Sequence, residues 1–187
     1  SVLKKASQLE IKTICPLHGP ILRENLGYYI NKYDIWSKYE TESEGVYIAC
    51  ASIHGNTLKV CEKLKEILEE KGLEKVVLAD LSREDWAEAV EDSFRYGKIV
   101  FASATYDMGI FTPMRDLLLN LKERNYQNKK VAIIENGTWA PNAARCMKEI
   151  ISTMKNIEIV EPVVTIKSTL KEEDIEKLNE LAENLLK

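Results

Sequence analysis

One polar loop of this chain combines the features of an anion-binding turn. It reads Ser52-Ile53-His54-Gly55-Asn56-Thr57 and lies between an apolar segment and a helical pattern. Backbone N–H groups and the dipole at a helix N-terminus favour an anion, Gly55 allows close backbone approach, and the Ser, Asn and Thr side chains add neutral donors. The triphosphate motif GxxxxGKS/T and the dinucleotide motif GxGxxG are both absent from this loop. The loop therefore predicts a site for a single phosphate, or else an ordinary N-capped turn.

A second loop has the composition that a planar heterocycle requires. It reads Ser103-Ala104-Thr105-Tyr106-Asp107-Met108-Gly109-Ile110 and follows another apolar segment. Small residues leave backbone donors and acceptors accessible to the pyrimidine edge of a flavin, and Tyr106 offers a flat surface for part of its face. The alternative interpretation is a loop with a surface tyrosine.

A third loop, Asn136-Gly137-Thr138-Trp139-Ala140-Pro141-Asn142, also follows an apolar segment. Trp139 stands in polar surroundings, which makes it a candidate stacking partner for a ligand. The alternative is a lid residue that packs on Pro141. Together, a single-phosphate loop and two loops suited to a flavin ring predict FMN as the cofactor.

The elements that must position these loops alternate between strand and helix patterns. Continuous apolar runs predict strands buried on both faces, and each is followed by an amphipathic segment. This order predicts a doubly wound α/β fold with a five-stranded parallel sheet. In such sheets ligands bind beyond the carboxyl ends of the strands, where all three loops lie. The expected strands are Val46–Ala51, Val76–Ala79, Ile99–Ser103, Val131–Glu135 and Ile157–Ile166. The expected helices are Leu58–Lys71, a segment capped by Ser82 and ending near Tyr96, Pro113 to Arg124, Ala143–Met154 and Leu170–Lys187.

Charge and composition exclude several classes of function. The net charge of −4 argues against nucleic acid, which needs a basic face, and no apolar run is long enough for a membrane span. None of the four cysteines forms a CxxC pair, so no zinc ribbon is expected, and we expect a cytoplasmic protein. A response-regulator receiver shares the fold but needs acidic residues where this chain has Ser52 and Ser103.

Residues 1–43 differ in character and form the expected N-terminal appendage, with the flavin-binding domain at 44–187. Leu9–Cys15 has a strand-like pattern, Tyr28 to Tyr39 predicts a short helix, and the polar run at 40–45 predicts a linker. The segment has an apolar cluster, which should fold back on the domain or pair with a second chain. Its members are Tyr28, Tyr29, Ile30, Tyr33, Ile35 and Trp36. We also expect a homodimer.

The three loops and the head of the chain together resemble one protein family. Ser52 to Thr57 resembles the FMN phosphate loop of flavodoxins, and the second loop resembles their isoalloxazine loop. Cys15-Pro16-Leu17-His18-Gly19-Pro20-Ile21-Leu22-Arg23 resembles the end of the metallo-β-lactamase-like domain of flavodiiron proteins. In that family an aromatic stretch and a flavodoxin-like domain follow. The resemblance therefore implies a flavodoxin-like fold, with the strand order 2-1-3-4-5 in the five-stranded parallel sheet.

The resemblance implies an electron-transfer role. FMN would feed electrons to a diiron centre that reduces oxygen or nitric oxide, with rubredoxin or a reductase as the electron donor. His18 matches the last diiron ligand, but no HxExDH motif is present, so this chain alone should hold no metal site. Two rivals stay open: a flavodoxin-like NAD(P)H:quinone reductase, and a flavin-free interaction module. Pro141 favours the module, because the family's third loop is expected to be glycine-rich there.

Overall fold

A central parallel sheet organises the chain, and the computed structural model describes residues 2–6 and 8–187. Five long strands pair in the order β2-β1-β3-β5-β6, and the short β4 pairs antiparallel with β3. Counted without β4, this is the predicted order 2-1-3-4-5, so the flavodoxin-like fold is confirmed. The strands are β1 (Ser43–Ala51), β2 (Val76–Asp80), β3 (Tyr96–Tyr106), β4 (Gly109–Ile110), β5 (Gln127–Asn136) and β6 (Lys155–Ile166).

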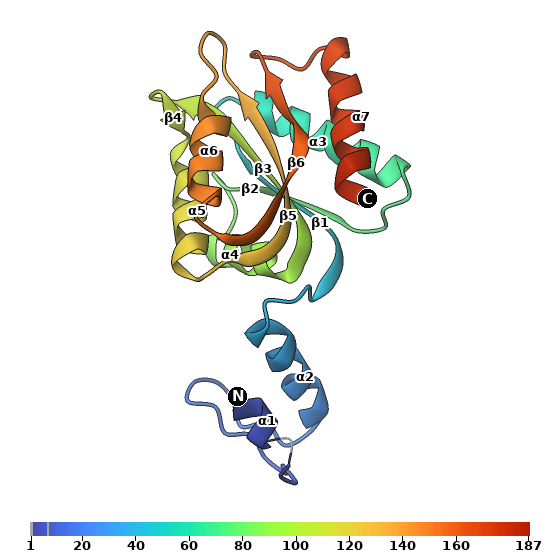
Figure 1. Ribbon diagram of the computed structural model, residues 1–187, viewed down its shortest axis with the longest axis vertical. Helices are drawn as coiled ribbons and strands as arrows, with labels where there is room; N and C mark the ends of the chain where they lie inside the picture. The colour runs from blue at the N-terminus through green and yellow to red at the C-terminus, as the bar shows by residue number, and fades with distance from the viewer. Residues whose placement is uncertain (1, 7) are drawn as a thin grey trace.

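Helices cover both faces of this sheet (Figure 1). One face carries α3 (Asn56–Glu70) and α7 (Glu172–Leu186), and the other carries α4 (Trp86–Arg95), α5 (Thr112–Glu123) and α6 (Ala143–Ile151). Alternate residues of β1 serve the two cores: Val46 and Ile48 lie in the α3–α7 core, whereas Tyr47 and Ala49 lie in the other. This double burial explains why the strands read as continuous apolar runs.

The strand register brings the predicted loops to one edge. Ala51 at the end of β1 pairs with Ser103, and Ala104 of β3 pairs with Asn136 at the end of β5. Asn136 in turn pairs with Ile166 at the end of β6. Because all four strands run in parallel, the loops that follow them leave the sheet side by side.

Three local expectations were wrong. Leu9–Cys15 forms no strand; within the described head of the chain, Ile14 makes only an isolated bridge with Leu22, since two short segments without a third strand seldom form a stable sheet. Asp85, not Ser82, caps α4, and its Oδ1 accepts a hydrogen bond from Ala87 N at 2.7 Å. The linker is shorter than expected because β1 begins at Ser43.

The N-terminal segment lies beyond the amino ends of the strands (Figure 1). It contains α1 (Val2–Ala6) and α2 (Leu26–Ser37), and α2 has no buried residue. Glu42 joins α2 to the domain: it accepts hydrogen bonds from Lys32 Nζ at 2.7 Å and Trp36 Nε1 at 2.6 Å, and its own N–H donates to Arg95 O. Four aromatic side chains of α2 stay exposed, whereas Tyr39, just after α2, contacts Phe94 of α4 with ring centroids 6.3 Å apart. Pairing of the exposed aromatic residues with a second chain stays a prediction. These residues are Tyr28, Tyr29, Tyr33 and Trp36.

Cys50 and Cys61 are both fully buried and act as small apolar side chains of the α3–α7 core. Across residues 2–6 and 8–187, no helix is both long enough and apolar enough to cross a membrane.

A buried lysine stands near the amino end of β5. Lys129 is 3% exposed, and its Nζ donates to Phe94 O at 2.7 Å and Tyr96 O at 2.8 Å. These carbonyls belong to the C-terminal end of α4, where a cation is favoured. Burial nevertheless lowers the pKa of Lys129 to about 8.

This lowered pKa predicts a pH-dependent stability. Between pH 8 and about 10.5, Lys129 is neutral in the folded chain but still protonated in the unfolded chain. Stability therefore rises with pH in this window, by up to about 3 kcal/mol. Urea unfolding at pH 7 to 10 measures the free energy of unfolding of the unmodified chain and of Lys129→Met. The difference between the two free energies should show this rise with pH. Lys155→Met, on the exposed end of β6, is the matched control and should leave the pH dependence unchanged. A difference for Lys129→Met that is flat in pH would contradict the prediction.

Candidate functional site

The three predicted loops meet in one cavity at the carboxyl edge of the sheet. Its volume is about 260 Å³, and its lining is mostly hydroxyl, amide and small side chains. The lining residues are Ser52, Ile53, His54, Asn56, Thr57, Ala104, Thr105, Asn136, Gly137, Thr138 and Ser168. Residues that lie far apart in the sequence therefore share one polar space, as the fold requires.

The first loop leaves its donors unused. Gly55, at φ 83°, is the N-cap of α3, and no side chain caps this helix. The Ser52 hydroxyl is buried, and within the described chain it has no hydrogen-bond partner, although the residue is only 9% exposed. Thr57, 2% exposed, also lines the cavity. Since a buried hydroxyl without a partner costs free energy, this end of the cavity is suited to an acceptor-rich group such as a phosphate.

Thr105 ties the second loop to the third. Its Oγ1 accepts hydrogen bonds from Asn142 N at 3.0 Å and Ala143 N at 3.2 Å, at the start of α6. Gly137 lies against the same hydroxyl: a Cβ there would come within 3.1 Å of Thr105 Oγ1 and 3.0 Å of Pro141 Cα. The hydrogen bonds of Thr105 therefore fix the relative position of the two loops, and a side chain at position 137 would press on both.

Ser168, in the loop after β6, is a wall of the cavity that the sequence reasoning missed. Asn136 Nδ2 donates to Ser168 O at 2.9 Å, and Ser168 N donates to Asn136 Oδ1 at 3.1 Å. This reciprocal pair holds Ser168 at φ 72°, a left-handed conformation. Applying the rule of carboxyl strand ends to the fifth strand as well would have found this residue.

Several predicted site residues lie outside this cavity. Ser103 is buried beneath it and donates to Ala104 O at 3.0 Å. Tyr106, Asp107 and Gly109 line a separate cavity of about 280 Å³ on the outer side of the second loop. Tyr106 is exposed, and its ring meets that of Phe111 edge-on at 5.8 Å.

Trp139 is 96% exposed. It does not pack on Pro141 as a lid, and it lies at the rim of the site.

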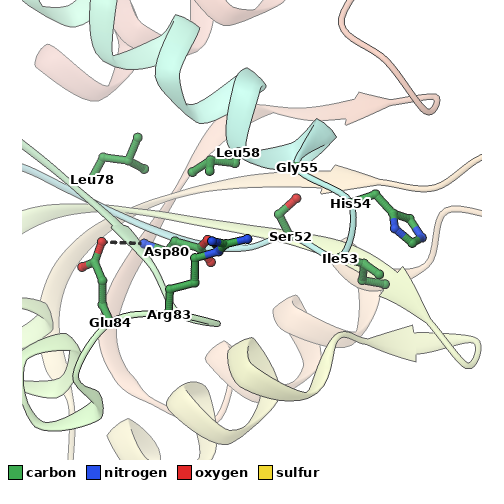
Figure 2. Close-up of a pocket in the computed structure, with 9 residues that line it drawn as sticks. All are labelled: Ser52, Ile53, His54, Gly55, Leu58, Leu78, Asp80, Arg83 and Glu84. Atoms are coloured by element: carbon green, nitrogen blue, oxygen red, sulfur yellow. Dashed lines mark hydrogen bonds and ion pairs between the residues drawn. The ribbon is translucent and has the colours of Figure 1, made fainter.

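A larger cavity of about 610 Å³ lies on the β2 side of the first loop, and Gly55 faces it. Figure 2 shows Leu58 and Leu78 on one side of this space, Arg83 and Glu84 on the other, and His54 pointing away. Its acidic groups have partners within the β2–α4 turn: Arg83 Nε lies 3.4 Å from Asp80 Oδ2, and Glu84 Oε1 accepts from Asp80 N at 3.1 Å. A cavity therefore lies on each side of the first loop.

Comparison with known proteins gives relatives that are longer than this chain. No family model matches it. An uncharacterised protein of Methanocaldococcus jannaschii is 26% identical over 189 residues, covering 100% of this chain and 47% of the relative. A nitric oxide reductase of Moorella thermoacetica is 27% identical over 181 residues, covering 95% and 44%. The chain therefore spans about half the length of the curated relatives that it matches.

Solved structures agree with these relatives. A flavodiiron protein of Thermotoga maritima is 26% identical with a TM-score of 0.81, over 99% of this chain and 46% of that protein. The chain matches the C-terminal, flavodoxin-like part of flavodiiron proteins. Two further structures share the fold. The rubredoxin:oxygen oxidoreductase of Desulfovibrio gigas has a TM-score of 0.87 at 21% identity, over 97% of this chain and 45% of that one. An archaeal flavodoxin has a TM-score of 0.63 at 21% identity, over 74% and 94%.

His18 is the residue that the resemblance to flavodiiron proteins matches to a diiron ligand. This histidine lies exposed in the N-terminal segment, before α2. In the described part of the chain, no three histidine, cysteine or acidic side chains come together in a group that could hold a metal ion.

The tight packing around Gly137 predicts a sharp contrast between two glycines. Gly137→Ala forces its Cβ against backbone atoms of Pro141, and we expect a loss of roughly 1–3 kcal/mol in unfolding free energy. Gly109→Ala is the matched control, since its Cβ would find its nearest neighbours at 3.7 and 3.9 Å, an ordinary contact. Chemical unfolding of both variants measures the difference. Equal stability of the two variants would show that the third loop can relax around a side chain.

Proposed function

We propose that this chain binds FMN at the carboxyl edge of its sheet and acts as an electron-transfer module. The observation that carries the proposal is the uncapped start of α3 beside the partnerless, buried Ser52 hydroxyl. A flavin cofactor accords with the flavodiiron and flavodoxin neighbours, and the finer assignment to FMN rests on the single-phosphate character of the first loop.

The polar groups around the cavity fit the phosphate and the polyol chain of FMN. The first N–H groups of α3 have no intrahelical partner and would donate to phosphate oxygens, as would the hydroxyls of Ser52 and Thr57. Asn56 and Thr138 line the same cavity and offer further polar groups. The alternating hydroxyls of the polyol can exchange hydrogen bonds with such a lining. Among the described residues no lysine or arginine lines this cavity, so the helix dipole and neutral donors would meet the phosphate charge.

The ring system would lie toward the rim of the site. Tyr106 and Trp139 present flat, exposed surfaces at the second and third loops, and Thr105 fixes these loops relative to one another. Bound FMN would supply the capacity to take up and release electrons one at a time. The chain itself supplies the phosphate grip, the orientation of the ring and the charges around it.

The role in a complete protein follows from the longer relatives. We propose that a lactamase-like domain carrying a diiron centre accepts the electrons, and that rubredoxin or a reductase supplies them to the FMN of a homodimer. The T. maritima neighbour is named a flavodiiron protein, and the D. gigas neighbour is named for rubredoxin and oxygen. The M. thermoacetica relative is named a nitric oxide reductase. These names support a terminal reduction of oxygen or nitric oxide.

One observation favours a second candidate, a flavin-free interaction module. Trp139 is almost fully exposed, and an exposed tryptophan on a loop suits a protein contact as well as a flavin face. The two candidates differ in a single measurable property, which is flavin affinity.

Titration of the flavin-free chain should show that FMN binds more tightly than FAD or riboflavin. FAD must place an adenosine group beyond the phosphate, and riboflavin lacks the phosphate that the first loop is suited to hold. Quenching of flavin fluorescence measures each affinity. Equal or tighter binding of FAD would disprove the preference for FMN, and absence of binding of all three would favour the flavin-free module.

The phosphate grip predicts a specific loss of affinity in Thr57→Ala. Removing a donor to a charged phosphate should weaken FMN binding by roughly 1–3 kcal/mol, while riboflavin binding should change little. Thr153→Ala is the control, because that hydroxyl bonds only to Ile150 O at the far end of α6. Equal losses for FMN and riboflavin would place the phosphate elsewhere.

Stacking by the rim residues predicts a change in flavin fluorescence. If Tyr106 and Trp139 contact the ring, Tyr106→Ala and Trp139→Ala should each raise the residual fluorescence of bound FMN and weaken binding by about 0.5–1.5 kcal/mol. Trp36→Ala, on α2 beyond the amino ends of the strands (Figure 1), is the control. Unchanged affinity and quenching in Trp139→Ala would remove Trp139 from the flavin site.

A further inference from the structure

Glu135 is a buried carboxylate that directly precedes Asn136, a residue of the cavity lining. It lies at the end of β5, paired with Ser103 on one side and Thr165 on the other, and is 7% exposed. Its Oε2 accepts a hydrogen bond from Ala144 N at 2.9 Å, and its Oε1 accepts one from Thr165 Oγ1 at 2.8 Å. Both oxygens act as acceptors, which is the role of an ionised carboxylate.

Part of this arrangement is explained by the start of α6. The N-cap residue Asn142 makes no side-chain cap, because its amide group faces Met108 O and Arg145 Nε instead. Glu135 reaches across from β5 and caps the helix in its place. A neutral acceptor could do the same, however, and a buried charge costs more free energy than a buried neutral group. The cap alone therefore does not account for a carboxylate.

The charge of Glu135 is poorly compensated. In the described parts of the chain no lysine or arginine forms an ion pair with it; Arg145, the arginine of α6, pairs with Glu149. Only the N-terminus of α6 offers partial positive charge. An unpaired charge in a buried position is screened less than a surface charge, so its field extends to the adjacent Asn136 and Gly137, which line the cavity.

We propose that Glu135 tunes the reduction potential of the flavin by holding a fixed negative charge beside it. This inference rests on the proposed binding of FMN. When a flavin takes up two electrons and one proton, it gains one unit of negative charge. A neighbouring carboxylate opposes that gain, because like charges repel. Glu135 thus weakens binding of reduced FMN relative to oxidised FMN and makes the bound flavin a stronger electron donor.

Glu135→Gln tests the charge while keeping the shape and the acceptor oxygen. Anaerobic titration with dithionite against a reference dye gives the midpoint potential of bound FMN, and fluorescence gives the affinity for oxidised FMN. We expect the potential to rise, with reduced FMN gaining roughly tenfold in affinity relative to oxidised FMN, because the repulsion between two like charges is removed. Glu158→Gln, exposed and paired with Lys130 toward the amino end of β6, should leave the potential unchanged.

A second variant separates tuning from helix capping. Glu135→Met removes both the charge and the cap, so it should lower stability yet raise the potential in the same direction as Glu135→Gln. Bound FMN with an unchanged potential in either variant would show that Glu135 is only a cap, and would leave the proposed function intact. Failure of the unmodified chain to bind FMN would overturn the proposed function and this inference together.

Discussion

The parallel pairing of β1 with β3 is the constraint on which the site depends. Ala51 lies opposite Ser103, so the next residues of both strands leave the sheet at the same height. A one-residue slip would turn Ser52 away from the cavity and would exchange the two apolar faces of β1, each buried by different helices. Exposing either core would cost free energy, and this cost fixes the strand register. The register in turn fixes the positions of the loops. The free energy of hydrophobic burial that positions the site is therefore far larger than the contribution of any of its own hydrogen bonds.

Much of this could be predicted from sequence because burial on both faces leaves a plain signature. Five apolar runs predicted the strands, and the resemblance to flavodoxins predicted their order. The helix after each run indicated the edge of the sheet at which the loops lie. The residues that define the cavity floor, such as Thr57 and Thr105, follow from that topology. Predictions from local sequence patterns failed where tertiary contacts determine the structure. Ser82 matches a capping pattern, but Asp85 takes the cap, and the strand pattern at Leu9–Cys15 has no third strand to join.

Side-chain direction was the other limit of sequence reasoning. Trp139 and Ser168 stand in comparable polar loops, yet one projects into solvent and the other lines the cavity. The difference comes from Asn136, whose side chain bonds the backbone of Ser168 on both sides. A pair of residues more than thirty positions apart leaves no periodic trace in the sequence. For the same reason Glu135 reads in the sequence as the polar end of a strand, and its capping of α6 becomes visible only in the fold.

The two ends of β5 carry opposite buried charges, and each meets the helix end of complementary sign. Lys129 bonds the terminal carbonyls of α4, and Glu135 bonds an N–H at the start of α6. Helix dipoles favour both placements, so the same strand ties two helices on one face of the sheet by charge as well as by packing. The two charges are not equivalent in function. Lys129 lies at the amino end of β5, at the opposite end from the cavity. There the free energy cost of burying its charge affects only the stability of the fold. Glu135 lies at the carboxyl end, where ligands of this fold bind, so the charge that secures α6 is also felt by whatever occupies the cavity. The Glu135 carboxylate therefore both caps α6 and contributes to the electrostatic potential in the cavity.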